Sequence, residues 1–322
     1  MKDFNLLYSE LQKKENEIYN IWNKAKNEKN KLNIVVIVIC ILVDIIIFKG
    51  FKKSVISFDE VEEFKITFLM MFSILFIVSD FIIYIIIYSV FGKNQKEYLR
   101  EYKNIIIGKL IGNFYSNLEY FPSKEIPEYI YEEATYDDYY NRYDSEDYLE
   151  AQLNSKASIQ MAEVITKKVT RRRNSRGGSS TTTTIIFHGL FAKLVIDKSI
   201  NSELKIMRNG KFFGDNRLQM DSSEFEKYFD VQASNKIKGM QLLTADVMEE
   251  LIDFQNKTNM KYDIVIKNNN IYLRFHSGSM FEPQNINNGA IDKDSIEKYF
   301  YMLNFTYNLS NKLIKIINET EL

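Results

Sequence analysis

The sequence predicts an α+β protein that carries a transmembrane hairpin within its N-terminal third. Two long apolar runs near the N-terminus, flanked by polar helical segments, predict two membrane-spanning helices. After them, short runs of β-branched and aromatic residues alternate with amphipathic segments, which predicts a mainly antiparallel sheet with packed helices. We therefore expect a cytoplasmic amphipathic helix (1–32), a transmembrane hairpin (33–92), a juxtamembrane helix (93–121) and a cytoplasmic α+β domain (122–322).

An apolar repeat of seven residues predicts the first helix. The repeat consists of Phe4, Leu11, Ile18, Ala25 and Leu32. Three residues further on, Leu7 and Ile21 are apolar but Lys14 and Glu28 are charged, so the coiled-coil pattern is weak. The alternative is an amphipathic helix that packs on the cytoplasmic domain; the helix could also pair with the juxtamembrane helix as a stalk.

The two apolar runs extend from Asn33 to Phe48 and from Ile66 to Phe91. A spanning helix needs about 20 residues. The second run exceeds this length, and the first reaches it when its flanking lysines snorkel, which predicts spans at 33–49 and 66–91. A long polar helix precedes the first run and no small-residue cleavage site follows it, so we do not expect a cleaved signal peptide.

Positive charges gather at the two outer ends of this hairpin. The basic residues there are Lys13, Lys14, Lys24, Lys26, Lys29 and Lys31 before the first span and Lys93, Lys96, Arg100, Lys103 and Lys109 after the second. In the loop between the spans, acids offset the lysines. The positive-inside rule therefore predicts a multi-pass protein with both termini in the cytoplasm. The abundance of Ile, Asn, Lys and Tyr suggests an AT-rich bacterial genome, and hence the bacterial cell membrane.

Each predicted span contains one aspartate, Asp44 and Asp80. An ionisable group in hydrocarbon is costly, and one hypothesis is that several copies of the hairpin build a proton or cation path from these residues. The other interpretation is structural: each carboxyl is protonated, or hydrogen-bonds across the helix pair to fix its register. The structural interpretation is favoured because no second polar stripe accompanies the two residues.

The predicted cytoplasmic part begins with a helix, which an acidic segment follows. A helix is predicted from Lys93 to Tyr120, ending before Pro122. From Glu128 to Glu150 the chain is rich in acids and tyrosines but has no glycine for a calcium-loop turn. We therefore interpret the acids as a solvated face, and the tyrosines as rings laid on the domain with their hydroxyls outward.

The later segments supply the sheet and its helices. Strands are predicted at 158–169 and 183–196, the latter with Gly189 as a possible bulge, and at 204–207. YDIVIK-NNN-IYLRFH is the clearest hairpin. Thr244 can cap a helix to about Lys257, and Asp294 with Glu297 resembles a capping box that opens a last helix.

Little in the sequence indicates catalysis. The chain has a net charge of -1, one cysteine (Cys40) and two histidines, His188 and His276, and it contains no P-loop, GxGxxG, HExxH or GxSxG motif. The balanced charge argues against a nucleic-acid binder, and the single cysteine excludes CxxC metal sites. We predict no catalytic, cofactor-binding or metal-binding residues, no cofactor, and leave an enzymatic role open but disfavoured. An unrecognised hydrolase would require acids and a histidine that converge in one pocket.

Several short motifs resemble a bacterial membrane-protein family of unknown function, domain of unknown function 3137. They are NLEYFP (117–122), YDSEDYLEA (143–151), FHGLF (187–191), SEFEKYFDV (223–231), LLTADVMEELIDF (242–254) and NNNIYLRFH (268–276). The resemblance implies paired spans ahead of a cytoplasmic domain but no activity. At FHGLF the family more often has a basic or polar residue where His188 stands, and Ala245 replaces a frequent proline.

The stretch between the first two predicted strands is strongly basic. Its charged residues are Lys167, Lys168, Arg171, Arg172, Arg173 and Arg176, and Gly177 to Thr182 form the predicted tip. It is interpreted as a solvated loop, with contact to anionic lipid headgroups as the alternative. The leading functional hypothesis is a membrane-anchored interaction or scaffold module with a protein partner or self-association. The alternatives are an oligomeric transport or channel element that uses Asp44 and Asp80, and the hydrolase.

Overall fold

The computed structural model describes residues 3–55, 62–136, 138–173, 179–210, 217–283 and 289–319. Its contacts divide the chain into two compact units. One unit comprises Met1–Lys13, Lys103–Gln284 and Asp292–Leu322, and the other comprises Lys14–Tyr102 and Asn285–Ile291. The first is the α+β unit and the second is the helical unit.

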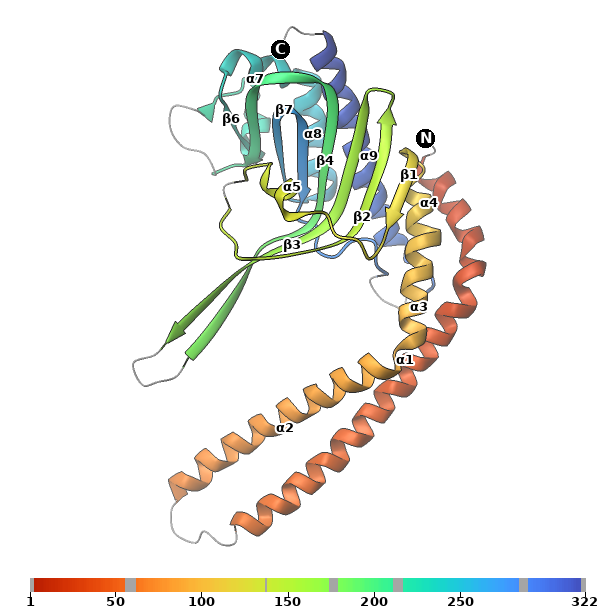
Figure 1. The fold of residues 1–322 in the computed structure, drawn as a ribbon, viewed down its shortest axis with the longest axis vertical. Coiled ribbons are helices and arrows are strands. Elements are labelled where there is room, and N and C mark those ends of the chain that lie inside the picture. The colour runs from red at the N-terminus through yellow and green to blue at the C-terminus, as the bar shows by residue number, and fades with distance from the viewer. Residues whose placement is uncertain are drawn as a thin grey trace. The chain divides into compact units, whose positions relative to one another are not determined.

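The described residues of the helical unit form the helices α1, α2 and α3. Helix α1 (Phe4–Val55) is continuous and enters it at Lys14, α2 follows at Glu62–Phe91, and α3 at Lys93–Tyr102 (Figure 1). The predicted repeat positions Ile18, Ala25 and Leu32 are buried, so the apolar stripe of the first helix is confirmed.

Glu28 explains why the seven-residue pattern is broken by charge. Its carboxylate accepts hydrogen bonds from Asn94 Nδ2 at 2.9 Å and from the backbone N–H of Gln95 at 3.2 Å. Gln95 lies in the first turn of α3, where backbone N–H groups have no partner within the helix and the helix dipole favours a negative charge. The pairing of α1 with α3, expected as a stalk, therefore includes a polar cap on the first turn of α3.

Among the described residues, one helix is long and apolar enough to cross a membrane, namely α1 over Phe4–Lys49. A second is obtained if Phe76–Ser89 and Lys93–Ile111, which bend at a short break, are counted as one span. Length and composition of this kind fit a membrane anchor and an N-terminal signal sequence equally. The predicted two-span hairpin therefore stays a prediction.

A seven-stranded antiparallel sheet forms the centre of the α+β unit. Its strands are β1 (Ser116–Phe121), β2 (Arg142–Asn154), β3 (Ala157–Arg173), β4 (Ser179–Arg208), β5 (Arg217–Leu218), β6 (Phe229–Ala233) and β7 (Tyr262–Phe275). Their order is β1-β2-β3-β4-β6-β5, and β7 pairs with β4.

Strands β4 and β7 both fold back on themselves and are nested, so that β7 lies between the two arms of β4 (Figure 1). Leu190 of the first arm of β4 pairs with Phe275, whereas Ile206 of the second arm pairs with Ile264. The reversal of β7 lies at Asn268, which has a left-handed φ of 56°. The hairpin predicted from YDIVIK-NNN-IYLRFH is thus confirmed, because asparagine adopts this backbone at low cost.

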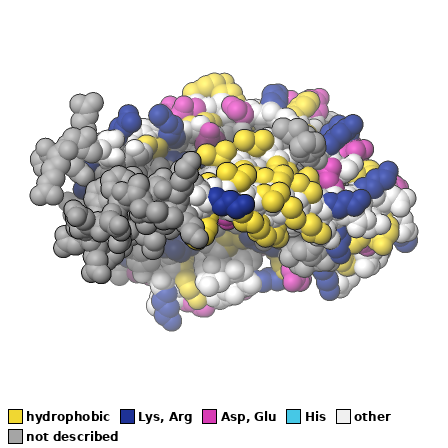
Figure 2. Space-filling model, turned by 90° about the horizontal axis from the view of Figure 1, so that it is seen from below, with side chains coloured by type: hydrophobic (Ala, Val, Ile, Leu, Met, Phe, Trp, Pro, Cys, Tyr) yellow, Lys and Arg dark blue, Asp and Glu magenta, His cyan; other side chains and the backbone are white. Residues whose placement is uncertain are grey.

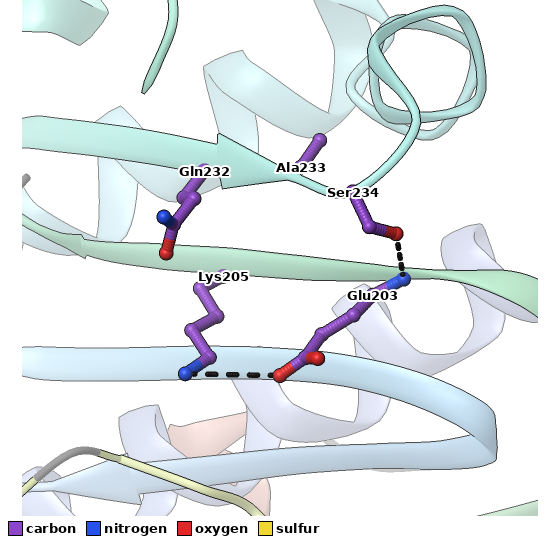
Figure 3. Close-up of a pocket in the computed structure, with 5 residues that line it drawn as sticks. All are labelled: Glu203, Lys205, Gln232, Ala233 and Ser234. Carbon is purple, nitrogen blue, oxygen red and sulfur yellow. Dashed lines mark hydrogen bonds and ion pairs between the residues drawn. The ribbon is translucent and has the colours of Figure 1, made fainter. Parts of the chain in front are cut away.

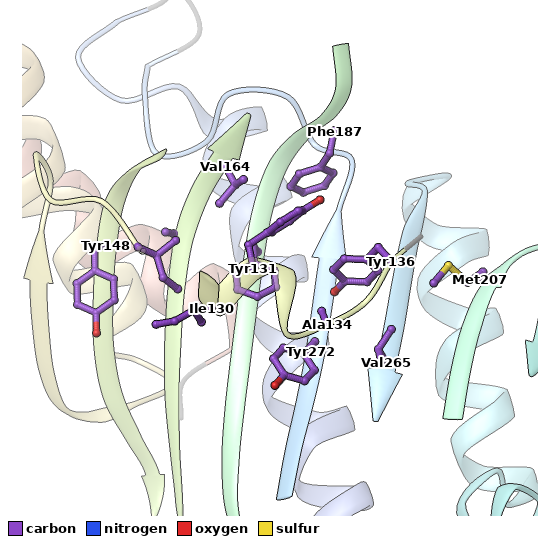
Figure 4. Packing of buried hydrophobic residues seen from close by; sticks show 13 residues of the cluster. Ile130, Tyr131, Ala134, Tyr136, Tyr148, Val164, Phe187, Met207, Val265 and Tyr272 are labelled. Carbon is purple, nitrogen blue, oxygen red and sulfur yellow. The ribbon is translucent and has the colours of Figure 1, made fainter. Parts of the chain in front are cut away.

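Helices cover both faces of the sheet. On one face lies α5 (Glu128–Glu132), whose Ile130 and Tyr131 enter an aromatic core with Phe187 and Phe191 (Figure 4). On the other lie α8 (Ala245–Thr258) and α9 (Lys293–Glu319), where the rings of Phe254 and Phe305 stack with centroids 4.1 Å apart. The short elements η1 (Lys103–Ile107), α4 (Gly108–Ile111), α6 (Ser223–Tyr228) and α7 (Lys236–Leu242) complete the unit.

The helix predicted at 93–120 is too long. It ends with α4 at Ile111, and Ser116–Phe121 is strand β1, which pairs with β2. Pro122 follows the strand and not the helix, and pairing with β2 decides the conformation of a segment whose own preference is weak.

The tyrosines of 128–150 are more buried than the prediction of outward-facing hydroxyls implies. Tyr131, Tyr136 and Tyr148 belong to the core, whereas Tyr129 and Tyr139 are exposed. The acids were interpreted as a solvated face, but Asp147 in this segment is fully buried. The predicted tyrosine-rich surface is therefore mostly an interior layer under α5.

Three local predictions need correction. Gly189 is not a bulge; the register of β3 and β4 shifts at Thr166/Lys167, and a Cβ at Gly189 would lie 1.9 Å from the carbonyl oxygen of Phe275. Thr244 precedes α8 but its side chain makes no capping hydrogen bond. At α9 the capping carboxylate belongs to Asp292, which accepts from Ser295, and not to Asp294.

Candidate functional site

The basic stretch is a β-ribbon and not a loose loop. Strands β3 and β4 remain paired as far as Arg173 and Ser179 and extend beyond the rest of the sheet (Figure 1). The side chain of Arg173 and all of Arg176 lie outside the described residues. The solvated loop predicted here is therefore shorter, because Ser179 to Thr182 belong to β4.

Most described charges on the ribbon face hydroxyl groups. Arg171 pairs across the ladder with Thr181, and Arg172 with Ser180. Lys167 is neutralised by Asp144, whose Oδ2 lies 3.0 Å from Nζ, and Lys168 Nζ lies 5.0 Å from the Tyr139 ring centroid.

In the described part of the chain no carboxylate pairs with Lys168, Arg171 or Arg172. Ile185, opposite Lys167, is 58% exposed. The described part of the ribbon thus presents guanidinium, ammonium and hydroxyl groups together with the exposed apolar side chain of Ile185. This is a set that suits a surface of phosphate groups over hydrocarbon.

The two aspartates of the helical unit lie near each other around Cys40. The carboxyls of Asp80 and Asp44 both lie close enough to the Cys40 thiol to interact with it electrostatically. Oδ1 of Asp44 and Oδ1 of Asp80 are shielded from solvent and accept no hydrogen bond among the described residues. Asp44 also lines a cavity of about 570 Å³ with Ile41, Ile45, Phe48, Lys49 and Phe76.

The FHGLF motif positions a buried carboxylate. His188 Nε2 lies 3.2 Å from Glu163 Oε1, and the backbone N–H of Met280 donates to Glu163 Oε2 at 2.7 Å. Ser279 Oγ also lies 3.4 Å from His188 Nε2. A serine–histidine–acid relay requires the two ring nitrogens to have different partners, so this arrangement is not such a relay. Burial raises the pKa of Glu163, although Met280 and His188 oppose the rise.

A second buried cluster joins η1 to the sheet. Lys103 Nζ lies 2.6 Å from Asp147 Oδ2, and the Tyr120 hydroxyl donates to Asp147 Oδ1 at 2.6 Å. Burial raises the pKa of Asp147 to about 6, despite the attraction of Lys103. Glu146, Asp147 and Glu163 have ligand atoms within 4.8 Å of one another, which is close enough for a cation. The Lys103 ammonium, 3.7 Å from Glu146 Oε2, already supplies a positive charge there.

The third cluster lies at the end of the β7 hairpin. Arg274 is 1% exposed, and its Nε lies 2.6 Å from Asp263 Oδ2. Its Nη1 binds Asp138 and the Tyr131 hydroxyl. His276 Nε2 lies 3.3 Å from the same Asp263 oxygen. A cavity of about 250 Å³ opens over this cluster.

This third cluster places a histidine and acids in one cavity, as the hydrolase hypothesis requires. Burial alone would raise the pKa of Asp263, but the hydrogen bond from His276 and the charge of Arg274 lower it below its usual range.

In a smaller pocket between β4 and β6, the polar side chains that line the wall bond to one another or to nearby backbone groups (Figure 3). Lys205 Nζ lies 3.7 Å from Glu203 Oε1 and donates to the carbonyl of Thr135 at 2.7 Å. Ser234 Oγ accepts from the backbone N–H of Glu203 at 2.9 Å. These contacts fasten the segment after α5 to the sheet, which is a structural role.

Sequence reasoning identified His188 and His276 but not their partners. Glu163, Asp263 and Arg274 each stand within an apolar, β-branched run, and a charge there must be paired inside the protein. A charged residue within such a run was therefore the sequence signal that could have identified these three residues. Lys103 and Asp147 are far apart in sequence and carry no comparable local signal.

Comparison with known proteins supports the resemblance in the α+β unit. Residues 185–315 match the model of the family described as protein of unknown function (DUF3137). The FHGLF, SEFEKYFDV, LLTADVMEELIDF and NNNIYLRFH motifs lie in this range, whereas NLEYFP and YDSEDYLEA precede it.

No curated protein sequence matches the chain. Among solved structures, the crystal structure of the mycobacterial trehalose monomycolate transport factor A, TtfA, is similar with a TM-score of 0.31 and 9% identity. The alignment covers 68% of this chain and 95% of that chain. A similarity of this degree supports no argument about function.

Proposed function

We propose that the protein is a membrane-anchored interaction module. In this proposal two spans at 33–49 and 66–91 hold the chain in the bacterial cell membrane, and both termini are cytoplasmic. The part after residue 93 is then a cytoplasmic domain that binds a protein partner or a second copy of the chain beside the inner leaflet.

The observation that carries the anchor is the apolar surface of α1 and α2. On α1 the exposed large apolar side chains are Ile34, Val35, Ile37, Val38, Ile41, Leu42, Ile45, Ile46 and Phe48. On α2 they are Ile74, Ile77, Val78, Phe81, Ile82, Tyr84, Ile85 and Ile86. When the molecule is seen from below, yellow side chains gather in a patch that a basic side chain interrupts (Figure 2).

Lipid is the medium that suits this surface. Leaving one such side chain in water costs roughly 1.5 kcal/mol, so the α1 face alone costs on the order of 10 kcal/mol. That is as large as the net stability of a typical domain, about 5–15 kcal/mol. The exposure of apolar side chains on both helices supports two spans and not one.

Cysteine labelling tests the topology, because Cys40 is the one native cysteine. On a Cys40→Ser background, Ser54→Cys near the end of α1 should react with a membrane-impermeant maleimide applied to intact cells. Ser155→Cys, in the exposed turn between β2 and β3, should react only after lysis. Labelling of Ser155→Cys in intact cells contradicts the orientation, and extraction of the protein by alkaline carbonate contradicts the anchor.

Binding to a partner is tested separately. Crosslinking in native membranes followed by mass spectrometry should give a reproducible partner or a crosslinked dimer of the chain. A protein recovered only as an uncrosslinked monomer, with its topology confirmed, refutes the interaction module and leaves the anchor intact.

The β3–β4 ribbon supports contact with anionic headgroups. Lys168, Arg171 and Arg172 supply three unneutralised charges in the described part of the ribbon. Each basic residue near an anionic surface contributes about 1 kcal/mol, so the three favour contact by up to about a hundredfold. In nanodiscs, trypsin cleavage after Arg171 should be slower in anionic than in neutral lipid.

A matched pair of variants assigns this protection to the ribbon. Arg172→Gln with Lys168→Gln should reduce the difference between the two lipids. Lys156→Gln, in the exposed turn between β2 and β3, with Lys236→Gln, at the exposed start of α7, should preserve it. Equal cleavage of the unmodified protein in both lipids refutes the contact.

One observation favours a second candidate function, an oligomeric transport element. Asp44 and Asp80 each keep a shielded oxygen without a hydrogen-bond donor among the described residues, as a site for a proton or cation would require. Reconstituted vesicles should then show a cation or proton flux that Asp80→Asn abolishes without altering insertion. Unchanged flux in Asp80→Asn, or no flux in the unmodified protein, refutes this function.

A further inference from the structure

The cavity over the β7 hairpin is lined by charges from neighbouring strands. Arg208 ends β4, while Lys261 precedes and His276 follows the hairpin. The backbone N–H of His276 donates to the carbonyl of Lys261 at 2.9 Å, so the two residues are fixed side by side. All of the lining residues lie within the α+β unit.

The base of this cavity is rigid and already charged. Arg274 is held by Asp263 and Asp138, and its guanidinium carbon lies 4.0 Å from the Tyr136 ring centroid. The Phe187 ring packs against the His276 ring edge-on, with centroids 5.1 Å apart. Such a base cannot rearrange readily, because each contact depends on the others.

The rim adds positive charge that nothing in the described part of the chain neutralises. Neither Arg208 nor Lys261 has a carboxylate partner there. The lining set contains three permanent cations, Arg208, Lys261 and Arg274, against the carboxylates of Asp138 and Asp263, so it has a net charge of +1 with His276 neutral. A partly enclosed cavity with this excess attracts anions.

His276 completes the recognition set. Asp263 is ionised at neutral pH because its pKa is lowered, so its oxygen can only accept and His276 Nε2 must donate. This fixes the orientation of the ring, and Nδ1 has no partner among the described residues. An imidazole oriented by a carboxylate is well suited to contact a ligand oxygen through its second nitrogen when it is protonated.

We propose that this cavity is a binding site for a phosphate group, with Arg208, Lys261 and His276 as its ligands and the Arg274–Asp263 pair as its fixed base. Guanidinium, ammonium and imidazolium groups are the donors that bind phosphate most strongly. A volume of about 250 Å³ accommodates a small phosphate monoester or a headgroup, but no large cofactor. The site depends neither on the membrane anchor nor on the ribbon.

Histidine NMR tests the site directly, because the chain has two histidines, His188 and His276. In the full-length protein labelled with carbon-13 histidine and carrying no histidine tag, two ring signals are expected, and His188→Gln assigns them. Inorganic phosphate should shift the His276 signal in a saturable way and leave the His188 signal in place. No shift of the His276 signal in any of the arms below overturns the proposal.

Variants at the rim separate binding from general charge effects. Arg208→Gln with Lys261→Gln should weaken binding about tenfold or more, because two charged donors are removed. Lys156→Gln with Lys236→Gln should leave the affinity unchanged, and so should Arg171→Gln with Arg172→Gln on the ribbon. Both rim residues are exposed, and circular dichroism confirms folding of each variant. Equal affinity of the rim variant and the unmodified protein overturns the assignment.

Three arms of the titration experiment identify the source of the phosphate group. The same titration is made with inorganic phosphate, with glycerol phosphate and with nanodiscs that contain phosphatidic acid. A shift with the soluble compounds supports a soluble ligand, and a shift with the nanodiscs alone supports a lipid headgroup.

Discussion

Replacing Lys103 with methionine leaves the buried Asp147 carboxylate without its ammonium partner. Lys103 is 6% exposed and Asp147 0%, and the two charged atoms lie 2.6 Å apart. Breaking a buried pair by removing one partner typically costs about 3–5 kcal/mol. We expect the free energy of unfolding of Lys103→Met to fall by about this amount at pH 8.

The loss of unfolding free energy in Lys103→Met should be larger at pH 8 than at pH 5. In the unmodified protein the pKa of Asp147 is raised to about 6, above its unfolded value of about 3.9, because burial outweighs the attraction of Lys103. Because the pKa is raised on folding, protonated Asp147 contributes to stability fully below about pH 4, and this contribution is lost as the pH rises through 6. The two-unit difference in pKa corresponds to about 3 kcal/mol. In Lys103→Met the pKa rises further, so at pH 5 Asp147 is neutral and the loss should shrink to about 1 kcal/mol.

Urea unfolding of the full-length protein in detergent, followed by pulse proteolysis at pH 5 and pH 8, measures this difference. Lys14→Met is the matched control, because its pair with Glu17 is exposed and should contribute little at either pH. An equal loss for Lys103→Met at both pH values, or no loss at pH 8, would refute the assignment of the loss to a buried charge.

Further substitutions at Gly189, Gly108 and Glu28 test packing and capping. Gly189→Ala should destabilise by about 3 kcal/mol or more in the same assay, because its Cβ would lie 1.9 Å from the Phe275 oxygen. Gly108→Ala, whose Cβ would lie 3.9 Å from its nearest neighbour, should stabilise by roughly 0.5–1 kcal/mol, and a comparable loss in both variants would contradict the steric argument. Glu28→Ala should lower the free energy of unfolding by about 1 kcal/mol and speed amide exchange at Gln95, whereas Glu28→Gln should retain part of the cap. Unchanged amide exchange at Gln95 in Glu28→Ala would contradict the capping role of Glu28.

Elements with strong local patterns could be predicted from sequence. The seven-residue stripe of α1, the Asn268 hairpin and the apolar face of α8 each follow from side-chain periodicity or a backbone preference of one residue. The family resemblance is supported in the same region, residues 185–315.

Elements decided by tertiary partners could not be predicted. Ser116–Phe121 is a strand because β2 lies beside it, and Tyr131 and Tyr136 are buried because they pack on the side chains of the sheet. The partner of His188 comes from the preceding strand β3, and the partner of His276 comes from the first arm of the β7 hairpin. Lys103 and Asp147 meet only in the folded sheet, and no spacing in the sequence relates them.

The nesting of β7 within β4 has a consequence for the order of folding. The second arm of β4 and the first arm of β7 pair through Ile206 and Ile264, so the centre of the sheet closes only after a long stretch of chain has been synthesised. The ends of β4 can pair with β3 and β6 earlier, which leaves its inner edges without partners during that interval. Closure over such a distance is slow, because loop entropy must be overcome before the contacts form. We expect the nascent chain to need protection of these edges until the β7 hairpin enters between them.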